Sequence, residues 1–185
     1  MKRNDNKSIE KMDMSEKMEM SEKILDRIIG FINSCDSKAS IVLALIGVLL
    51  TVICIEVPNH VIAAKDVDSF QLNCLFVIYI ICVVLCFISL AVSIAFLISV
   101  LYGRISGLKK SNIFFGDISI IRMEEYKKRI DKMNNQGYED DLIEQVYINS
   151  QICTRKYKRY NTSLIFLVIG LFLFMVAILF EIFVL

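Results

Sequence analysis

The stretch LNCLFVIYIICVVLCFISLAVSIAFLISVLY, residues 72–102, contains 31 residues and no charged side chain. About 20 apolar residues in a helix are enough to cross the hydrocarbon core of a bilayer. At about 1.5 Å per residue, this helix would measure roughly 46 Å against a core of about 30 Å. The stretch therefore predicts a transmembrane helix that tilts or extends past the bilayer.

Two further apolar blocks lie on either side of it. Residues 39–57 carry a single charge, Glu56, at the end of the block, and residues 163–185 are interrupted only by Glu181. The whole chain of 185 residues is 56% hydrophobic, whereas soluble domains are usually about 45–50% apolar. A soluble chain of this length could not bury all three helices. We therefore predict an all-α integral membrane protein with three transmembrane helices.

Lysine and arginine predict the orientation of these helices, because cytoplasmic segments are enriched in both. Residues 1–38 contain eight of them, residues 103–162 contain twelve, and residues 58–71 contain only Lys65. We therefore expect a multi-pass membrane protein whose N-terminus lies inside the cell. The N-terminal segment 1–38 and the segment 103–162 would be cytoplasmic, and the short loop 58–71 would be external.

The N-terminal segment carries the pattern of an amphipathic helix. From Ile24 its apolar residues recur three or four positions apart, at 24, 25, 28, 29 and 32, which places them on one helix face. This face could pack on the other cytoplasmic helices. Alternatively, it could lie on the membrane surface or mediate self-association.

Residues 103–162 form the only polar stretch large enough for a binding site. Phe114 and Phe115 stand beside Gly116 and Asp117, and the two rings are either core residues or an aromatic platform next to a carboxylate. Residues 122–134 predict a short helix that ends near Gly137, with this glycine in the left-handed conformation that ends many helices.

A single long helix is expected to follow. The sequence from Glu139 contains no proline, and no glycine before Gly170, so one helix could run from the middle segment through the third apolar block. Asn161, Thr162 and Ser163 are the weak point where it could break. The basic group Arg155, Lys156, Lys158 and Arg159 is either an inside-facing membrane anchor or an anion-binding cluster.

Several function classes are excluded by what the sequence lacks. The net charge is +1, which argues against binding a nucleic acid polymer by bulk charge. There is one histidine, and no nucleotide-binding glycine motif, metalloprotease motif or paired zinc motif. Cys82 and Cys86 stand four positions apart and predict apolar packing rather than a metal pair, and nothing in the six cysteines indicates a disulfide framework. We therefore expect no enzyme activity, no metal and no cofactor.

The middle of the chain resembles a known family. The resemblance covers roughly residues 25–180 and rests on Ser111 to Ile118 (SNIFFGDI), Glu124 to Tyr126 (EEY), Asp141 to Val146 (DLIEQV), Asn149-Ser150, Lys156-Tyr157, and Asp36 to Ala39 (DSKA) before the first span. As a set, these motifs resemble the membrane effector domain of Pycsar anti-phage systems (PycTM). In this sequence Arg122 stands where a serine- or threonine-type helix cap would be expected.

The resemblance implies a function that composition does not reveal. Effectors of this family are paired with a pyrimidine cyclase, which makes cUMP or cCMP during phage infection. The effector senses this cyclic mononucleotide and impairs the inner membrane, so that the cell dies before phage spread. Three spans are too few to enclose a pore, so a homo-oligomer is expected. The other interpretation is a membrane-anchored scaffold or sensor that acts through its cytoplasmic helices without a nucleotide ligand.

The middle segment contains side chains suited to such a ligand. Arg155 or Lys156 could bind the phosphate through charge-assisted hydrogen bonds, and Phe115 or Tyr157 could stack on the base. Asp117, Gln145 and Asn149 could read the edge of the base. These seven residues form the predicted nucleotide-binding set.

Overall fold

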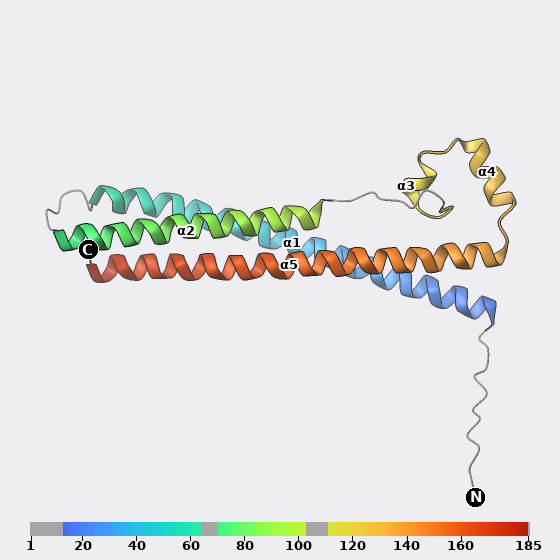
Figure 1. Cartoon of the computed structure of the whole chain (residues 1–185), viewed down its shortest axis with the longest axis horizontal. Helices are drawn as coiled ribbons and strands as arrows, with labels where there is room; N and C mark the ends of the chain where they lie inside the picture. The colour runs from blue at the N-terminus through green and yellow to red at the C-terminus, as the bar shows by residue number, and fades with distance from the viewer. Residues whose placement is uncertain (1–12, 64–69, 103–110, 185) are drawn as a thin grey trace, which may run out of the picture. The chain divides into compact units, whose positions relative to one another are not determined.

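The computed structural model describes residues 13–63, 70–102 and 111–184. Residues 1–12 of the predicted N-terminal segment, 64–69 of the predicted external loop and 103–110 at the start of the middle segment lie outside the described residues. The described residues contain five helices and no strand (Figure 1). The helices are α1 (Met14–Ala63), α2 (Phe70–Leu101), α3 (Phe115–Ile118), α4 (Met123–Asp131) and α5 (Asn135–Val184). The prediction of an all-α protein is confirmed.

Three of these helices, α1, α2 and α5, are long and apolar enough to cross a membrane. The chain divides into two compact units. The first, here called the polar unit, comprises residues 1–31 and 104–153, and the second, here called the bundle unit, comprises residues 32–103 and 154–185. Helices α1 and α5 contribute residues to both units. The membrane boundaries predicted above remain predictions.

The core of the bundle unit follows a heptad pattern along α2. Seven of its buried residues are spaced alternately four and three apart, and Ser89 is buried beside them: the seven are Tyr79, Val83, Cys86, Leu90, Ser93, Leu97 and Val100. This spacing keeps one face of a helix against its neighbours in left-handed bundles. Cys86 is 1% exposed and belongs to this core, which confirms that it is a packing residue. Helix α1 adds Cys35, Ala39, Ile46 and Ile53 to the same core.

Small residues bring α2 and α5 close together. The Ser89 hydroxyl donates to the Phe166 carbonyl at 2.7 Å, and the Ser93 hydroxyl donates to the Ser163 carbonyl at 2.9 Å. One turn further along α5, a Cβ at Gly170 would lie only 3.0 Å from Leu90 Cδ2. Small residues and serine hydroxyls are typical of helix contacts in membranes, where close backbone approach supplies the packing energy.

A large side chain at position 170 should therefore destabilise the bundle unit. Gly170→Leu would force Leu90 out of its place, and overpacking of this kind costs about 1–3 kcal/mol. Gly47→Leu is the matched control, because nothing lies within 4 Å of a Cβ at Gly47. We expect a lower thermal unfolding midpoint in detergent for Gly170→Leu and little change for Gly47→Leu. Equal midpoints would show that the α2–α5 contact is not tight.

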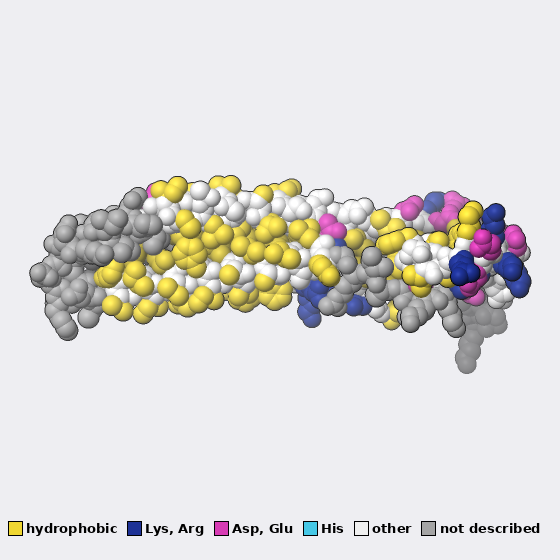
Figure 2. Space-filling model, turned by 90° about the horizontal axis from the view of Figure 1, so that it is seen from above, with side chains coloured by type: hydrophobic (Ala, Val, Ile, Leu, Met, Phe, Trp, Pro, Cys, Tyr) yellow, Lys and Arg dark blue, Asp and Glu magenta, His cyan; other side chains and the backbone are white. Residues whose placement is uncertain are grey.

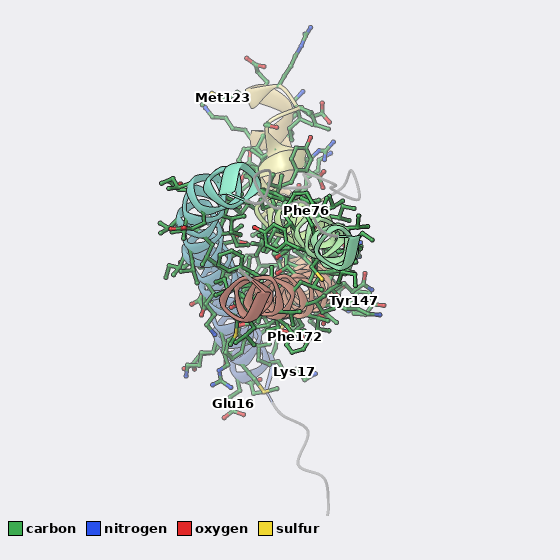
Figure 3. All side chains as sticks on the ribbon, turned by 90° about the vertical axis from the view of Figure 1, so that its left-hand side faces the viewer. Glu16, Lys17, Phe76, Met123, Tyr147 and Phe172 are labelled. Atoms are coloured by element: carbon green, nitrogen blue, oxygen red, sulfur yellow. The ribbon has the colours of Figure 1, made fainter. Side chains whose placement is uncertain are left out.

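The outer face of the bundle unit is apolar. Ile41, Val48, Val168 and Phe172 are all more than 60% exposed, and Phe172 points away from the bundle (Figure 3). Figure 2 shows hydrophobic side chains over most of the visible face of this unit. Water-soluble monomers rarely expose contiguous apolar surface of this extent, so this is the surface expected of helices that contact lipid.

The long C-terminal helix is confirmed, and its beginning differs from prediction. Helix α5 continues through Asn161–Ser163 without a break. The predicted left-handed stop at Gly137 is wrong, because this glycine lies in the first turn of α5. Its backbone N–H donates to the Asn134 side chain at 2.8 Å, so Asn134 acts as the N-cap of an earlier helix start. Helix α4 has already ended at Asp131.

At the start of α4, Arg122 stands in place of the serine- or threonine-type cap, as the sequence indicates. This residue is the N-cap with extended backbone, and its side chain makes no capping hydrogen bond. The acidic residues Glu124 and Glu125 stand in the first turn instead, where negative charge favours the positive end of the helix dipole.

Candidate nucleotide-binding site

The loop before α3 organises the polar unit. The Ser111 hydroxyl accepts hydrogen bonds from the backbone N–H groups of Ile113 and Phe114 at 3.1 and 2.9 Å. In return, the Asp117 carboxylate accepts from the Ser111 N–H at 3.0 Å. Ser111 and Asp117 are both buried. Serine and aspartate favour such turns because their short side chains satisfy nearby backbone donors.

Two further contacts join this loop to α4 and α5. The Tyr126 hydroxyl of α4 donates to the Asn112 carbonyl at 3.2 Å. The Asn112 N–H donates to Asp141 Oδ2 of α5 at 2.7 Å. Asp141 is only 9% exposed and its neighbour Leu142 only 2%. The backbone of Asn112 therefore connects three elements of the polar unit.

Two acceptor atoms in this cluster remain unpaired. Asn112 Oδ1 and Asp141 Oδ1 are buried and receive no hydrogen bond from the part of the chain that the structure describes. Leaving a buried acceptor without a donor costs about 1–3 kcal/mol, and more for a charged group. The cluster therefore has the capacity to accept further hydrogen bonds from a donor group.

The part of α1 that belongs to the polar unit contacts α5. The Tyr138 hydroxyl of α5 donates to the Glu22 carboxylate at 3.1 Å. Partial burial, followed by this contact with Glu22 and the charge of Asp141, raises the pKa of Tyr138. The phenol therefore stays a hydrogen-bond donor at least up to its ordinary pKa of about 10. Met123 on α4 and Tyr147 on α5 project from the unit (Figure 3) and are more than 60% exposed.

Four of the predicted nucleotide-binding residues lie in the polar unit. Phe115 is 64% exposed and packs its ring against Phe114, with centroids 4.8 Å apart. Asp117 is committed to the Ser111 N–H. Gln145 is buried, and the Asn149 amide donates to the Gln145 carbonyl at 2.8 Å. Phe115 is thus the member of these four with a widely exposed surface.

The other three lie in the bundle unit. Lys156 donates to both oxygens of Asp36 at 2.5 and 2.7 Å. Tyr157 packs against the apolar core, and Arg155 is exposed. One turn along α5, Arg159 donates to the Ser99 carbonyl near the end of α2 at 3.1 Å. Two basic residues of α5 therefore hold α1 and α2 at this end of the bundle unit.

Sequence reasoning missed three residues of these clusters. Asp36, Asn112 and Asp141 all stand in the motifs that carry the family resemblance, but they were given no ligand-binding role. Asp141 lies inside α5, which begins more than one turn earlier, at Asn135. These residues pair with groups from distant motifs. Spacing along the sequence does not reveal such pairing, so no signal in the sequence alone identifies them.

The hydrogen bond between the Asp117 carboxylate and the Ser111 N–H can be tested for its contribution to stability. Asp117→Ala would leave the buried Ser111 N–H without its acceptor, a loss of about 1–3 kcal/mol. We expect a lower thermal unfolding midpoint for this variant. Asp131→Ala removes an exposed carboxylate from the same unit and should change the midpoint little. Equal effects of the two substitutions would contradict the structural role of Asp117.

These observations define an all-helical protein with three helices suited to a membrane and a compact polar helical unit. The chain matches the sequence model of the Pycsar effector protein domain, PycTM, over residues 20–182, and it belongs to this family. It is also 29% identical over 192 aligned positions to the Pycsar effector protein GmPycTM of Gulbenkiania mobilis, with 89% of this chain and 97% of the relative covered. No solved structure matches the chain.

Proposed function

We propose that this protein is a Pycsar anti-phage effector that senses cUMP or cCMP made by a partner cyclase and impairs the inner membrane. Infected cells would then die before phage spread. The observation that carries the proposal is the family match over residues 20–182, together with three helices that could cross a membrane. An effector that acts on a membrane needs both a membrane-embedded part and a part that reaches the cytoplasmic messenger.

The proposed orientation places the messenger and the polar unit on the same side. The eight lysines and arginines of residues 1–38 and the twelve of residues 103–162 would face the cytoplasm. The loop 58–71 would be external, and the segments 39–57, 72–102 and 163–185 would span the inner membrane. Charged side chains gather over the polar unit in Figure 2, which is consistent with a unit in water.

The proposed ligand contacts use side chains from the predicted set. A cyclic mononucleotide has one negative charge and one flat base. Phe115 is exposed enough for a base to stack on it, whereas Tyr157 is partly buried against the core. Arg155 and Lys156 would bind the phosphate. Because Lys156 is paired with Asp36, a phosphate at Lys156 would compete with that carboxylate.

The ligand can act on the membrane only by binding an active state more tightly than the resting state. Helix α5 is one helix with residues in both units, so a change in its polar part is connected through the chain to the bundle unit. Three helices are too few to line a pore, and we therefore propose that the active form is a homo-oligomer.

Titration of the purified full chain in detergent tests the proposal. cUMP or cCMP should bind at micromolar or lower concentration, and cAMP and cGMP should bind much more weakly. Lys156→Ala should weaken binding at least tenfold if Lys156 binds the phosphate, and Lys158→Ala is the control at an exposed neighbouring position. Unchanged binding by Lys156→Ala would remove this residue from the site. Failure of both pyrimidine nucleotides to bind would contradict the proposed function.

A second candidate function is a membrane scaffold or sensor without a nucleotide ligand. The observation in its favour is the exposed apolar side chains of α1 in the polar unit, Met20, Ile29 and Phe31, which could bind a partner helix. This candidate predicts an unchanged dye permeability in cells whatever nucleotide is present. Nucleotide-dependent dye entry would exclude it.

A further inference from the structure

The exposed apolar stripes of α1 and α5 in the bundle unit both begin with a lysine. On α1 the exposed residues of one stripe are Lys38, Ile41, Leu45, Val48, Val52 and Ile55. On α5 the stripe with the same spacing is Lys158, Asn161, Ile165, Val168, Phe172 and Met175. Steps of three and four residues keep each stripe on one helix face. Each lysine therefore stands at the end of a surface suited to lipid.

An ion pair places these two lysines at the same level of the bundle unit. Lys156 of α5 contacts Asp36 of α1 at 2.5 Å, and the two helices run in the same direction (Figure 1). Lys38 and Lys158 each follow a member of this pair by two residues, which is a rise of about 3 Å along either helix. The two apolar stripes therefore begin at a common boundary.

Helix α2 reaches its end at the same boundary. Arg159 of α5 donates to the Ser99 carbonyl at 3.1 Å, and α2 runs opposite to α5 (Figure 1). Tyr102 directly follows α2, about one turn beyond Ser99, and is 72% exposed. Tyrosine is enriched where a membrane meets water, because its ring is apolar and its hydroxyl is polar. All three bundle helices thus mark one boundary.

This boundary carries an excess of positive charge. Residues 32–55 and 154–180 of the bundle unit contain one acidic and five basic residues, which all lie close to the ion pair: Asp36, Lys38, Arg155, Lys156, Lys158 and Arg159. The single carboxylate is already paired with Lys156, so it is not needed by the exposed lysines. A lysine at such a place lays its apolar stem along the helix and extends its ammonium group into the headgroup layer.

We propose that Lys38 and Lys158 bind the phosphates of anionic phospholipids, while the apolar stripes that follow them contact the acyl chains. The continuity of each lysine with an apolar stripe favours a lipid over a free phosphate, which would leave that surface unused. Basic residues at a membrane surface attract anionic lipids in this way. The proposal goes beyond the proposed function, because it requires no nucleotide.

The test measures lipid selectivity of the full chain reconstituted in phosphatidylcholine bilayers. Electron spin resonance of spin-labelled phosphatidylglycerol and phosphatidylcholine gives the relative association constant of the two lipids with the protein. One basic residue near an anionic surface strengthens binding about fivefold, so an average over all surrounding lipids should still favour phosphatidylglycerol at least about twofold. In the double variant Lys38→Gln with Lys158→Gln, the ratio should fall close to equality.

Lys127→Gln with Lys128→Gln is the matched control, because it removes two exposed lysines from α4 in the polar unit and should leave the ratio at the wild-type value. Sodium chloride at about 1 M shortens the Debye length to about 3 Å and should lower the wild-type ratio. This measurement, with the two single variants, decides the question if the double variant does not reconstitute.

Three results would overturn the proposal: equal association of the two lipids with the wild-type chain, an unchanged ratio in the double variant, or an equal fall in the control. Inorganic phosphate in excess should not displace the labelled phosphatidylglycerol. Displacement by inorganic phosphate would assign the lysines to a soluble anion and would also overturn the proposal. None of these results bears on nucleotide sensing, so the proposed function would stand or fall separately.

Discussion

Lys156→Asp is expected to destabilise the bundle unit strongly. The Lys156 side chain is 13% exposed and that of Asp36 33%, so the substitution would place two carboxylates together in a partly buried position. Breaking a buried ion pair costs about 3–5 kcal/mol. With allowance for the partial exposure of Asp36, we expect a loss of about 2 kcal/mol, which corresponds to a drop of roughly 4–8 °C in the unfolding midpoint for a chain of this size.

The reciprocal variants separate this contact from a general charge effect. Asp36→Lys should destabilise the chain in the same way, and the double variant Asp36→Lys with Lys156→Asp should recover at least half of the loss, because the pair is restored with its charges exchanged. Lys158→Asp changes the charge of an exposed residue on the same helix and should alter the midpoint by less than half as much. Additive losses in the double variant would show that the two side chains do not interact.

The second large effect concerns the side of the membrane on which the polar unit lies. In a variant without its native cysteines, Tyr147→Cys would place a thiol at an exposed position of the polar unit. A membrane-impermeant thiol reagent should leave this thiol unlabelled in intact cells and label it almost completely after permeabilisation. We expect a nearly all-or-none change, because the distribution of lysine and arginine predicts a single orientation of the chain.

His60→Cys in the predicted external loop provides the opposite pattern. This thiol should be labelled in intact spheroplasts, and permeabilisation should add little. Labelling at position 147 before permeabilisation would reverse the orientation, and the polar unit could then no longer meet a cytoplasmic nucleotide.

The bundle helices were largely predictable from the sequence. The uncharged residues 72–102 correspond closely to α2 at Phe70–Leu101, because an apolar run of this length has few other stable forms. The absence of proline after Glu139 predicted the continuous α5. The local error at Gly137 arose because glycine is common at helix ends, whereas here the Asn134 side chain starts a helix instead.

The polar contacts were much less predictable. Lys156 appeared as a phosphate ligand from its charge alone, but the structure pairs it with Asp36, 120 residues earlier in the chain. The sequence predicts that Asp117 reads the edge of a base, and it does not predict that the Asp117 carboxylate also accepts a hydrogen bond from the Ser111 N–H. Both outcomes depend on which distant groups fold next to each other, and periodicity along the sequence carries no information about this.

The most direct test of the central claim is dye release from liposomes that contain the purified full chain and no other protein. If the protein is an effector that turns a cyclic pyrimidine nucleotide into membrane damage, addition of cCMP or cUMP to the polar-unit side should release the trapped dye, and cAMP or cGMP at the same concentration should release little. Dye that stays trapped after saturating amounts of both pyrimidine nucleotides would contradict the account.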